Sequence, residues 1–290
     1  MKFAFIAAEK ADEGVARWCR ALGVSRAGYY AWVRRPESLH AREDRRLSVV
    51  IREVHERSRR TYGSPRVHAE LAARDEHVGR RRIIRLMQQE GLAARVRRRY
   101  RSTTMSDHDQ PVAPNLLERR FEADLPNQRW VGDTTELYVG EGGRLFLAAI
   151  LDLHSRFVVG WALSAVNDRH LAVKALQAAV RRRCPEAGLL HHSDQGSPYA
   201  SDDYQKALAA NGITCSMSRR GNYYDNAAME SWFSTLKFEL GERFTSYAKA
   251  KEDLFDYIEV FYNHQRRHSS LDYVTPAGYE RASRTAIATA

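Results

Sequence analysis

The sequence has few cysteines and no long apolar run. Its three cysteines, Cys19, Cys184 and Cys215, lie far apart and include no Cys-x-x-Cys pair. This spacing argues against a structural zinc site and favours a reducing compartment. No apolar stretch reaches the roughly 18–20 residues that would span a bilayer, and the first residues soon become too acidic for a signal peptide. We therefore expect a cytoplasmic protein without a membrane partner.

Positive charge is abundant but unevenly distributed. Residues 1–126 carry 27 Lys and Arg against 17 Asp and Glu, whereas residues 127–290 carry 19 of each. A basic segment beside a neutral one indicates a nucleic-acid-binding region attached to a separate core. The alternative is that the arginines only reflect a GC-rich coding sequence. A chain of 290 residues suits about two domains.

Residues 13–35 read EGVARWCRALGVSRAGYYAWVRR and have helix-turn-helix spacing. Gly23 permits a tight turn, and Ser25 can cap a second helix. In this interpretation the second helix presents Arg26 and Tyr29 to a DNA groove. A plain helical hairpin that packs on its neighbours fits the same pattern equally well.

A second helical unit is expected at about residues 44–92. Its last helix, RRRIIRLMQQ, offers Arg81 and Arg82 to phosphates, or simply exposes them on a solvated face. The next segment, 93–127, is rich in Arg, Ser, Thr, Asp and Pro and predicts a linker. Its basic start includes Arg98, which could follow a DNA backbone. The chain thus begins with an all-helical DNA-binding region that ends at about residue 92.

After residue 127 the periodicity changes from helical to strand-like. Three strand-like runs at about 129–139, 144–152 and 156–163 precede alternating helices and strands, which end in a long helix at about 225–240. This order predicts an α/β core at 128–290 with a mixed five-stranded sheet, flanking helices and a C-terminal helical extension. It is the order of the ribonuclease H-like fold, in which the first strand, the fourth strand and a following helix bring acids together.

Three acids lie on those expected elements: Asp133 in RWVGDTTELYV, Asp194 in LLHHSDQGSPY and Glu230 in YYDNAAMESWFSTLKFE, with 35 residues between the last two. A carboxylate inside an apolar strand is costly unless it is paired or binds metal. Two Mg²⁺ ions about 3.5–4 Å apart, held by such hard oxygen ligands, suit an in-line displacement at phosphorus. Alone, Asp194 could cap a turn and Glu230 could be a solvated helix residue. Together the three predict metal-dependent nucleic-acid chemistry.

Several blocks, in the same order, resemble the transposases of the bacterial IS-three family, which are related to retroviral integrases and use an Asp, Asp, Glu triad. The blocks cover nearly the whole chain and are YGSPRVHAEL (62–71), RRIIRLMQQEGL (81–92), PNLLERRF (114–121), RWVGDTTEL (129–137), LDLHSRFVVGW (151–161), HSDQGSPY (192–199), DNAAMESWFSTLKFE (225–239) and YNHQRRHSSLDYVTP (262–276).

The resemblance implies that Asp133, Asp194 and Glu230 are catalytic carboxylates that hold two Mg²⁺ ions, with Mn²⁺ as a substitute. The expected protein is a DDE transposase that cleaves DNA and transfers strands of an insertion sequence, first joining one end of the element to the other. The expected partners are terminal-repeat and target DNA, further copies of the chain on that DNA, and an upstream-frame protein or frameshift fusion. Such a bacterial protein would associate with the nucleoid when bound to DNA.

Two other functions fit the same residues. One is a ribonuclease H-like nuclease that only hydrolyses, and the other is an inactive DNA-binding regulator derived from a transposase. An intact triad together with Lys237 disfavours the second. Lys237 shares a helix face with Glu230, two turns later, and matches the position where the family places a basic residue near the reacting phosphate. As a surface lysine it would only snorkel into solvent.

Other polar residues have less specific interpretations. His192 could orient Asp194 or be a satisfied core histidine. Asn226 is expected to cap the following helix. Arg266 and Arg267 are expected to touch DNA or the sheet edge.

Asp152 has two possible roles at the turn between two predicted strands. It could take part in catalysis, but a buried pair between Asp152 and Arg156 is the preferred interpretation. A carboxylate placed there without such a partner would be costly to bury.

Overall fold

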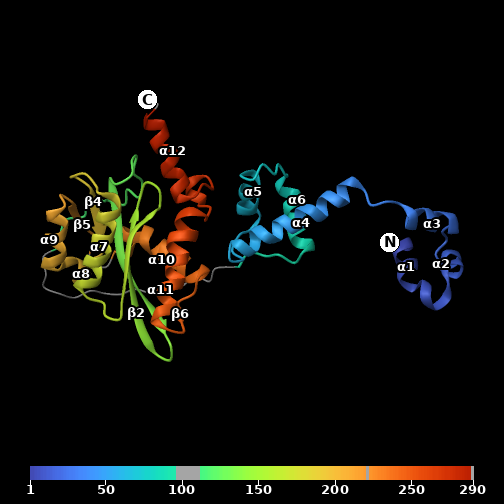
Figure 1. The fold of residues 1–290 in the computed structure, drawn as a ribbon, viewed down its shortest axis with the longest axis horizontal. Helices are drawn as coiled ribbons and strands as arrows, with labels where there is room; N and C mark the ends of the chain where they lie inside the picture. The colour runs from blue at the N-terminus through green and yellow to red at the C-terminus, as the bar shows by residue number, and fades with distance from the viewer. Residues whose placement is uncertain (96–111, 220–221, 289–290) are drawn as a thin grey trace.

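The computed structural model describes residues 1–95, 112–219 and 222–288. Arg98 and residues 96–111 of the predicted linker lie outside these residues. Along the chain follow a small N-terminal helical unit, a second helical unit and a sheet domain, and an extended segment separates the first two (Figure 1). In the described parts, no helix has both the length and the apolarity to cross a membrane.

The N-terminal unit has one helix more than the predicted hairpin. Its helices are α1 (Lys2–Glu13), α2 (Val15–Ala21) and α3 (Arg26–Arg34). Ser25 caps α3 as expected, because its hydroxyl accepts from the Gly28 amide at 3.0 Å. Ile6, Cys19 and Tyr29 form the buried centre of the three helices. The prediction that Tyr29 contacts DNA is therefore wrong, since its ring closes this small core and is only 2% exposed.

The second helical unit has its own apolar centre. Its helices are α4 (Leu39–Arg57), α5 (Ser64–Ala72) and α6 (Arg80–Gln89). Leu47, Val67 and Ile83, one from each helix, are fully buried in it. Arg82 donates to Asp44 of α4 at 2.7 Å, so this arginine joins two helices. Arg81 is exposed, and its contact with DNA stays a prediction.

The sheet domain contains the predicted five strands in the order β3-β2-β1-β4-β5. The strands are β1 (Arg129–Val139), β2 (Gly143–Asp152), β3 (Val158–Ser164), β4 (Leu190–Ser193) and β5 (Thr214–Met217). The first three are antiparallel, while β4 and β5 run parallel to β1. A two-residue strand that the sequence did not predict, β6 (Arg243–Phe244), pairs with the far end of β1.

Helices cover both faces of this sheet (Figure 1). On one face pack α7 (Arg169–Arg183), α8 (Ser197–Ala200) and α9 (Asp202–Ala210). On the other pack α10 (Ala227–Glu239), α11 (Tyr247–Phe255) and the π-helical segment η2 (Asp256–Tyr262). The C-terminal helix α12 (Pro276–Ala288) contacts the loop after β2, where its Glu280 accepts from Ser155. Each face therefore has its own apolar core, and the sheet is buried between them.

The end of the predicted linker belongs to the sheet domain. Leu117 is 1% exposed and packs in the core beneath α10. The Ser216 hydroxyl of β5 accepts from the amides of Leu116 and Leu117, and Asn115 donates to Asp225 at 2.9 Å. This segment is rich in polar residues, which is why its composition suggested a spacer, but its few apolar side chains are enough to anchor it.

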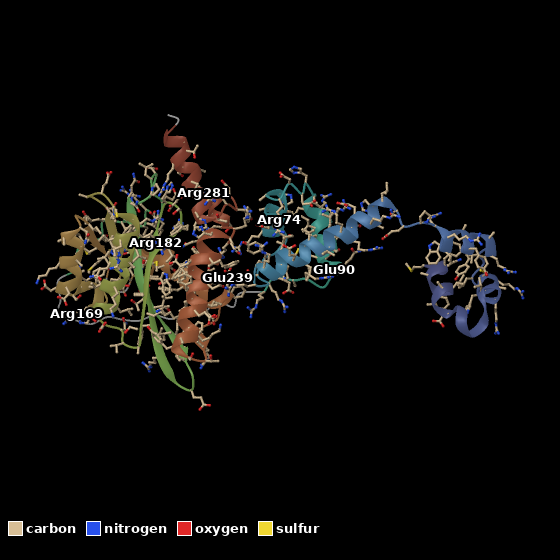
Figure 2. The ribbon with its side chains drawn as sticks, viewed as in Figure 1. Arg74, Glu90, Arg169, Arg182, Glu239 and Arg281 are labelled. Atoms are coloured by element: carbon tan, nitrogen blue, oxygen red, sulfur yellow. The ribbon has the colours of Figure 1, made fainter. Side chains whose placement is uncertain are left out.

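A buried ion pair joins α10 to the segment after η2. Arg266 donates to both carboxylate oxygens of Glu239, at 2.8 to 3.0 Å, and Tyr257 donates to the same carboxylate at 2.8 Å. Both charged side chains are at most 5% exposed. Glu239 lies on the side of the sheet domain that faces α4 and α5 (Figure 2). The Arg266 guanidinium is therefore engaged within the chain, and its contact with DNA stays a prediction.

Arg267 connects the sheet domain to the second helical unit. Its side chain donates to Glu70 of α5 at 2.8 Å, and its amide donates to the Tyr62 hydroxyl at 2.6 Å. Arg59 adds a pair with Asp256 of η2 at 2.5 Å. Arg267 is thus engaged within the chain, and its contact with DNA stays a prediction. The sheet domain and the second helical unit are held together by polar contacts that no local sequence pattern predicts.

We expect Glu239→Ala to lower the free energy of unfolding by about 3–5 kcal/mol, because it leaves the Arg266 charge buried without a partner. Urea unfolding followed by tryptophan fluorescence measures this. The control is Lys206→Ala, which removes an exposed i, i+4 pair with Asp202 and should cost less than about 1 kcal/mol. Equal effects of the two substitutions would contradict a buried, stabilising pair.

Candidate active site

Asp133 lies in β1, and Asp194 directly follows the end of the neighbouring strand β4. The parallel register pairs Val131 of β1 with His192 of β4, so both acids come two residues after a paired position. Alternation along β1 puts the Asp133 side chain on the sheet face of Val131, which is the face that α10 covers. Strand pairing between β1 and β4 stops just before the two acids. The two strands thus open where the carboxylates are.

Glu230 reaches the same place from α10. The helix packs its apolar side, including Met229 and Phe233, onto the sheet. Glu230 lies in the first turn, where a negative charge is favoured by the helix dipole. Its side chain is exposed at the edge of this contact. Glu230 is near enough to Asp133 for its charge to raise the pKa of Asp133.

The pKa of Asp133 is affected by both neighbouring acids. Burial raises the pKa of Asp133 well above its usual value, and the charges of Asp194 and then Glu230 raise it further. A hydrogen bond from the Thr134 amide at 2.7 Å opposes the shift. Burial also raises the pKa of Glu230. Among the described residues, no basic side chain forms an ion pair with Asp133 or Glu230.

The turn after β4 is shaped by Asp194 itself. Its carboxylate accepts from the Gly196 amide at 2.9 Å. A Cβ at position 196 would lie 2.9 Å from that same oxygen, so a glycine is needed for this close approach. The prediction that Asp194 could cap this turn is confirmed. One of its oxygens shapes the turn.

A buried network that the sequence did not reveal holds the start of α10. Asp225, in the 3-10 turn η1 (Tyr223–Asn226), is fully buried and accepts from Arg219 and Arg119 at 2.8 to 3.1 Å. The Arg219 guanidinium, together with that of Arg119, holds the pKa of Asp225 well below its usual value. The position of Glu230 depends on this anchor. Arg119 comes from the predicted linker, so only the fold could reveal the pair.

Asn226 occupies the N-cap position of α10, but its side chain makes no capping hydrogen bond. Its amide instead donates to the Gly132 carbonyl at 3.4 Å, next to Asp133. The predicted cap is therefore wrong in its side-chain role. Asn226 links the strand that carries Asp133 to the helix that carries Glu230, as a supporting residue would.

His192 does not orient Asp194. One of its ring nitrogens contacts the Ser216 hydroxyl at 2.8 Å and the other contacts Ser218 at 3.1 Å. Burial lowers the pKa of His192 to about 4. The residue is a satisfied core histidine that ties β4 to β5, and that alternative is the correct one.

The preferred prediction, a buried ion pair between Asp152 and Arg156, is wrong. Asp152 is fully buried and accepts from the Asn127 and His154 amides and from the Trp130 indole. Arg156 instead donates to the Phe121 carbonyl at 2.8 Å. Asp152 holds a turn at the far end of β2, and it does not belong to the cluster of three acids.

Lys237 lies on α10 two turns after Glu230, as expected. It is partly exposed, and its ammonium lies 3.7 Å from the Glu242 carboxylate. Such a long, solvent-exposed pair is weak, so a stronger anion can displace it. Its contact with DNA stays a prediction, as does that of the exposed Arg26 on α3.

Two kinds of family model match the chain. An integrase core domain matches residues 123–223, a second integrase core model matches residues 211–276, and an HTH-like domain matches residues 41–100. These matches follow the division seen in the structure, with the HTH-like domain on α4 to α6 and the integrase core on the sheet domain.

Two relatives are similar over most of their length. The chain is 44% identical to the insertion element IS600 uncharacterized 31 kDa protein of Shigella sonnei, over 90% of this chain and 96% of the relative. It is 38% identical to the transposase InsF for insertion sequence IS3A of Escherichia coli strain K12, over 97% of this chain and 98% of the relative.

Among solved structures, a simian T-cell lymphotropic virus intasome in complex with a PP2A regulatory subunit matches at a TM-score of 0.46 and 15% identity, covering 75% of this chain and 74% of that one. The HTLV-2 integrase catalytic core in complex with magnesium matches at a TM-score of 0.41 and 17% identity, covering 54% of this chain and 97% of that one. The extent of identity to the InsF transposase and the integrase core matches establish that the chain belongs to the IS3 family of insertion-sequence transposases.

Proposed function

We propose that Asp133, Asp194 and Glu230 are the catalytic carboxylates of this transposase and that they hold two divalent cations, Mg²⁺ or Mn²⁺. The observation that supports this most is the convergence of three acids from β1, β4 and α10 at a point where burial and mutual repulsion raise the pKa of Asp133. Asp133 and Glu230 form no ion pair with a basic side chain among the described residues, and carboxylates whose pKa is raised in this way are suited to a bound cation.

The donor set fits such ions by its chemistry. All three groups are hard oxygen ligands, which Mg²⁺ and Mn²⁺ prefer. In the part of the chain that the structure describes, no three His, Cys, Asp or Glu side chains converge closely enough to hold a single ion.

When bound, the cations would supply charge neutralisation for the attacking and leaving oxygens of a phosphodiester. The chain's own residues do the positioning. β1 and the end of β4 place the two aspartates, and the Asp225 network fixes the helix that presents Glu230. Lys237, which lies on the same helix face as Glu230 two turns later, is proposed to contact a phosphate of the bound strand. No covalent protein intermediate is required.

The proposed reaction is cleavage of DNA at an end of the element, followed by attack of the freed 3′-hydroxyl on a second phosphodiester. We propose terminal-repeat DNA and target DNA as substrates, with Arg26 and Arg81 as contacts in the helical units. Further copies of the chain and an upstream-frame protein or fusion are proposed as partners on that DNA. The excess positive charge of residues 1–126 supports the assignment of DNA binding to this half.

We expect Asp133→Asn, Asp194→Asn and Glu230→Gln each to slow cleavage and joining by at least about a hundredfold, or roughly 2.7 kcal/mol, because each removes a ligand charge. DNA binding should change little. The assay supplies labelled DNA from the ends of the element, with a free 3′-hydroxyl end to separate joining from hydrolysis.

The control for the triad substitutions is Asp202→Asn, an exposed acid of α9 that should leave both rates unchanged. Activity should be lost in a chelator and return with Mg²⁺ or Mn²⁺. A triad variant that keeps more than a few per cent of the wild-type rate would show that the residue is not a catalytic ligand.

The raised pKa of Asp133 also has a consequence for stability. Because the folded carboxyl releases its proton only at a higher pH than the unfolded one, folding is penalised progressively as pH rises above the ordinary value of 3.8. In the presence of a chelator, Asp133→Asn should therefore raise the thermal midpoint at pH 8, by about 2–4 °C for each kcal/mol of penalty removed. The gain should shrink as the pH falls toward 3.8.

Asp225→Asn should shift the thermal midpoint in the opposite direction in the same experiment. Its pKa is depressed in the folded chain, so its ionised form stabilises folding above the ordinary pKa, and the substitution should lower the midpoint at neutral pH. Thermal scans at pH 5 and pH 8 compare the two. A midpoint for Asp133→Asn at or below that of the wild type at pH 8 would contradict the electrostatic description of the site.

A further inference from the structure

A cavity of about 470 Å³ opens on a face of α10 that differs from the face of Glu230. Ala227, Ala228 and Ser231 line it from the first turns of the helix, and because consecutive residues turn by about 100°, this face differs from that of Glu230. The other walls come from the loop after β2, from α5 and from the segment after η2. The cavity is therefore bounded by both the HTH-like domain and the integrase core.

Positive charge in this cavity exceeds negative charge. Arg66, Arg156 and Arg266 line it. Glu239 binds Arg266 through two short hydrogen bonds and lies 3.9 Å from Arg66. Arg156 makes one hydrogen bond, to a backbone carbonyl, and within the described residues no carboxylate pairs with it. Two of the three guanidinium groups thus share the Glu239 carboxylate, and that of Arg156 has no ion-pair partner among the described residues.

Neutral donors complete the lining. The cavity is also lined by Ser269, Ser270 and His268. Burial, together with the charges of the three arginines, lowers the pKa of His268 to about 3, so this histidine is uncharged at neutral pH. Trp232 also lines the cavity; its side chain is 3% exposed, and its indole N–H has no acceptor among the described residues. A buried donor left unpaired is costly, and an anion in the cavity could satisfy it.

We propose that this cavity binds a phosphodiester group of the DNA strand and thereby fixes the HTH-like domain against the integrase core. Guanidinium groups form bidentate hydrogen bonds to phosphate oxygens, and the first turn of a helix favours an anion. The proposal rests on the proposed function in that DNA is the substrate. It adds a contact that lies outside the three carboxylates and Lys237.

The test substitutes Arg156→Gln in the full chain, because Arg156 neutralises no carboxylate and its loss leaves none unpaired. Binding of a fluorescent duplex from the end of the element is titrated without divalent cations at several salt concentrations. The dissociation constant should rise about tenfold or more, as for a lost hydrogen bond to a charged group, and the salt slope should fall by about one unit. Arg66→Gln should act in the same direction.

Two controls accompany this test. Arg181→Gln removes an equal charge from an exposed position on α7, on the opposite face of the sheet, and should leave affinity and slope unchanged. Arg156→Lys keeps the charge but cannot form the bidentate hydrogen bonds, so it should restore the salt slope and only part of the affinity. Thermal unfolding of each variant verifies that it is folded.

Inorganic phosphate, compared with chloride at equal ionic strength, separates the two sources of the ligand. Phosphate should raise the thermal midpoint of the wild type but not that of Arg156→Gln. If phosphate protects but DNA affinity and slope are unchanged in folded Arg156→Gln and Arg66→Gln, the cavity takes free phosphate only and the proposal is wrong. It is equally wrong if neither ligand distinguishes the variants.

These outcomes are independent of the catalytic assignment. Triad variants should bind DNA normally and fail in chemistry, whereas cavity variants should bind DNA less tightly. An active triad variant would therefore overturn the proposed catalytic residues while the DNA titrations still decide whether the cavity binds a phosphodiester.

Discussion

The burial of Asp133 beside the charges of Asp194 and Glu230 is the constraint on which the rest of the structure depends. A carboxylate that is buried near like charges opposes folding, and this opposition appears in the pKa of Asp133, which burial raises first and the two neighbouring charges raise further. The scaffold must therefore supply the stability that the site removes. It does so with two apolar cores, one on each face of the sheet, and with a buried network at Asp225 that holds the helix carrying Glu230.

Helix α10 connects most of the functional features. Its first turn presents Glu230, its N-cap Asn226 contacts the backbone next to Asp133, and its last residue, Glu239, forms the buried pair with Arg266. A third face lines the arginine-rich cavity. Any displacement of this helix would disturb the carboxylates, the cavity and the domain contact together.

The contact between the HTH-like domain and the integrase core is polar. Arg267 with Glu70, Arg59 with Asp256 and the Tyr62 hydroxyl hold it. Contacts between parts of one chain that are mostly polar allow the parts to move more readily than a large apolar interface would. A ligand that touches both sides would therefore change their relative position more than a ligand bound to either one.

The sequence by itself determined the five main strands, their order and the three acids, because periodicity and turn residues are local properties and the spacing of the triad is read directly from the chain. It missed the helix α1 and the short strand β6. It could not determine partners. Several residues are of types that are typical of DNA contacts, namely Arg82, Arg266, Arg267 and Tyr29. The fold, however, pairs the arginines with carboxylates and buries the tyrosine. Whether an arginine meets solvent or an acid far along the chain depends on which distant segments pack together, and only the tertiary structure decided that.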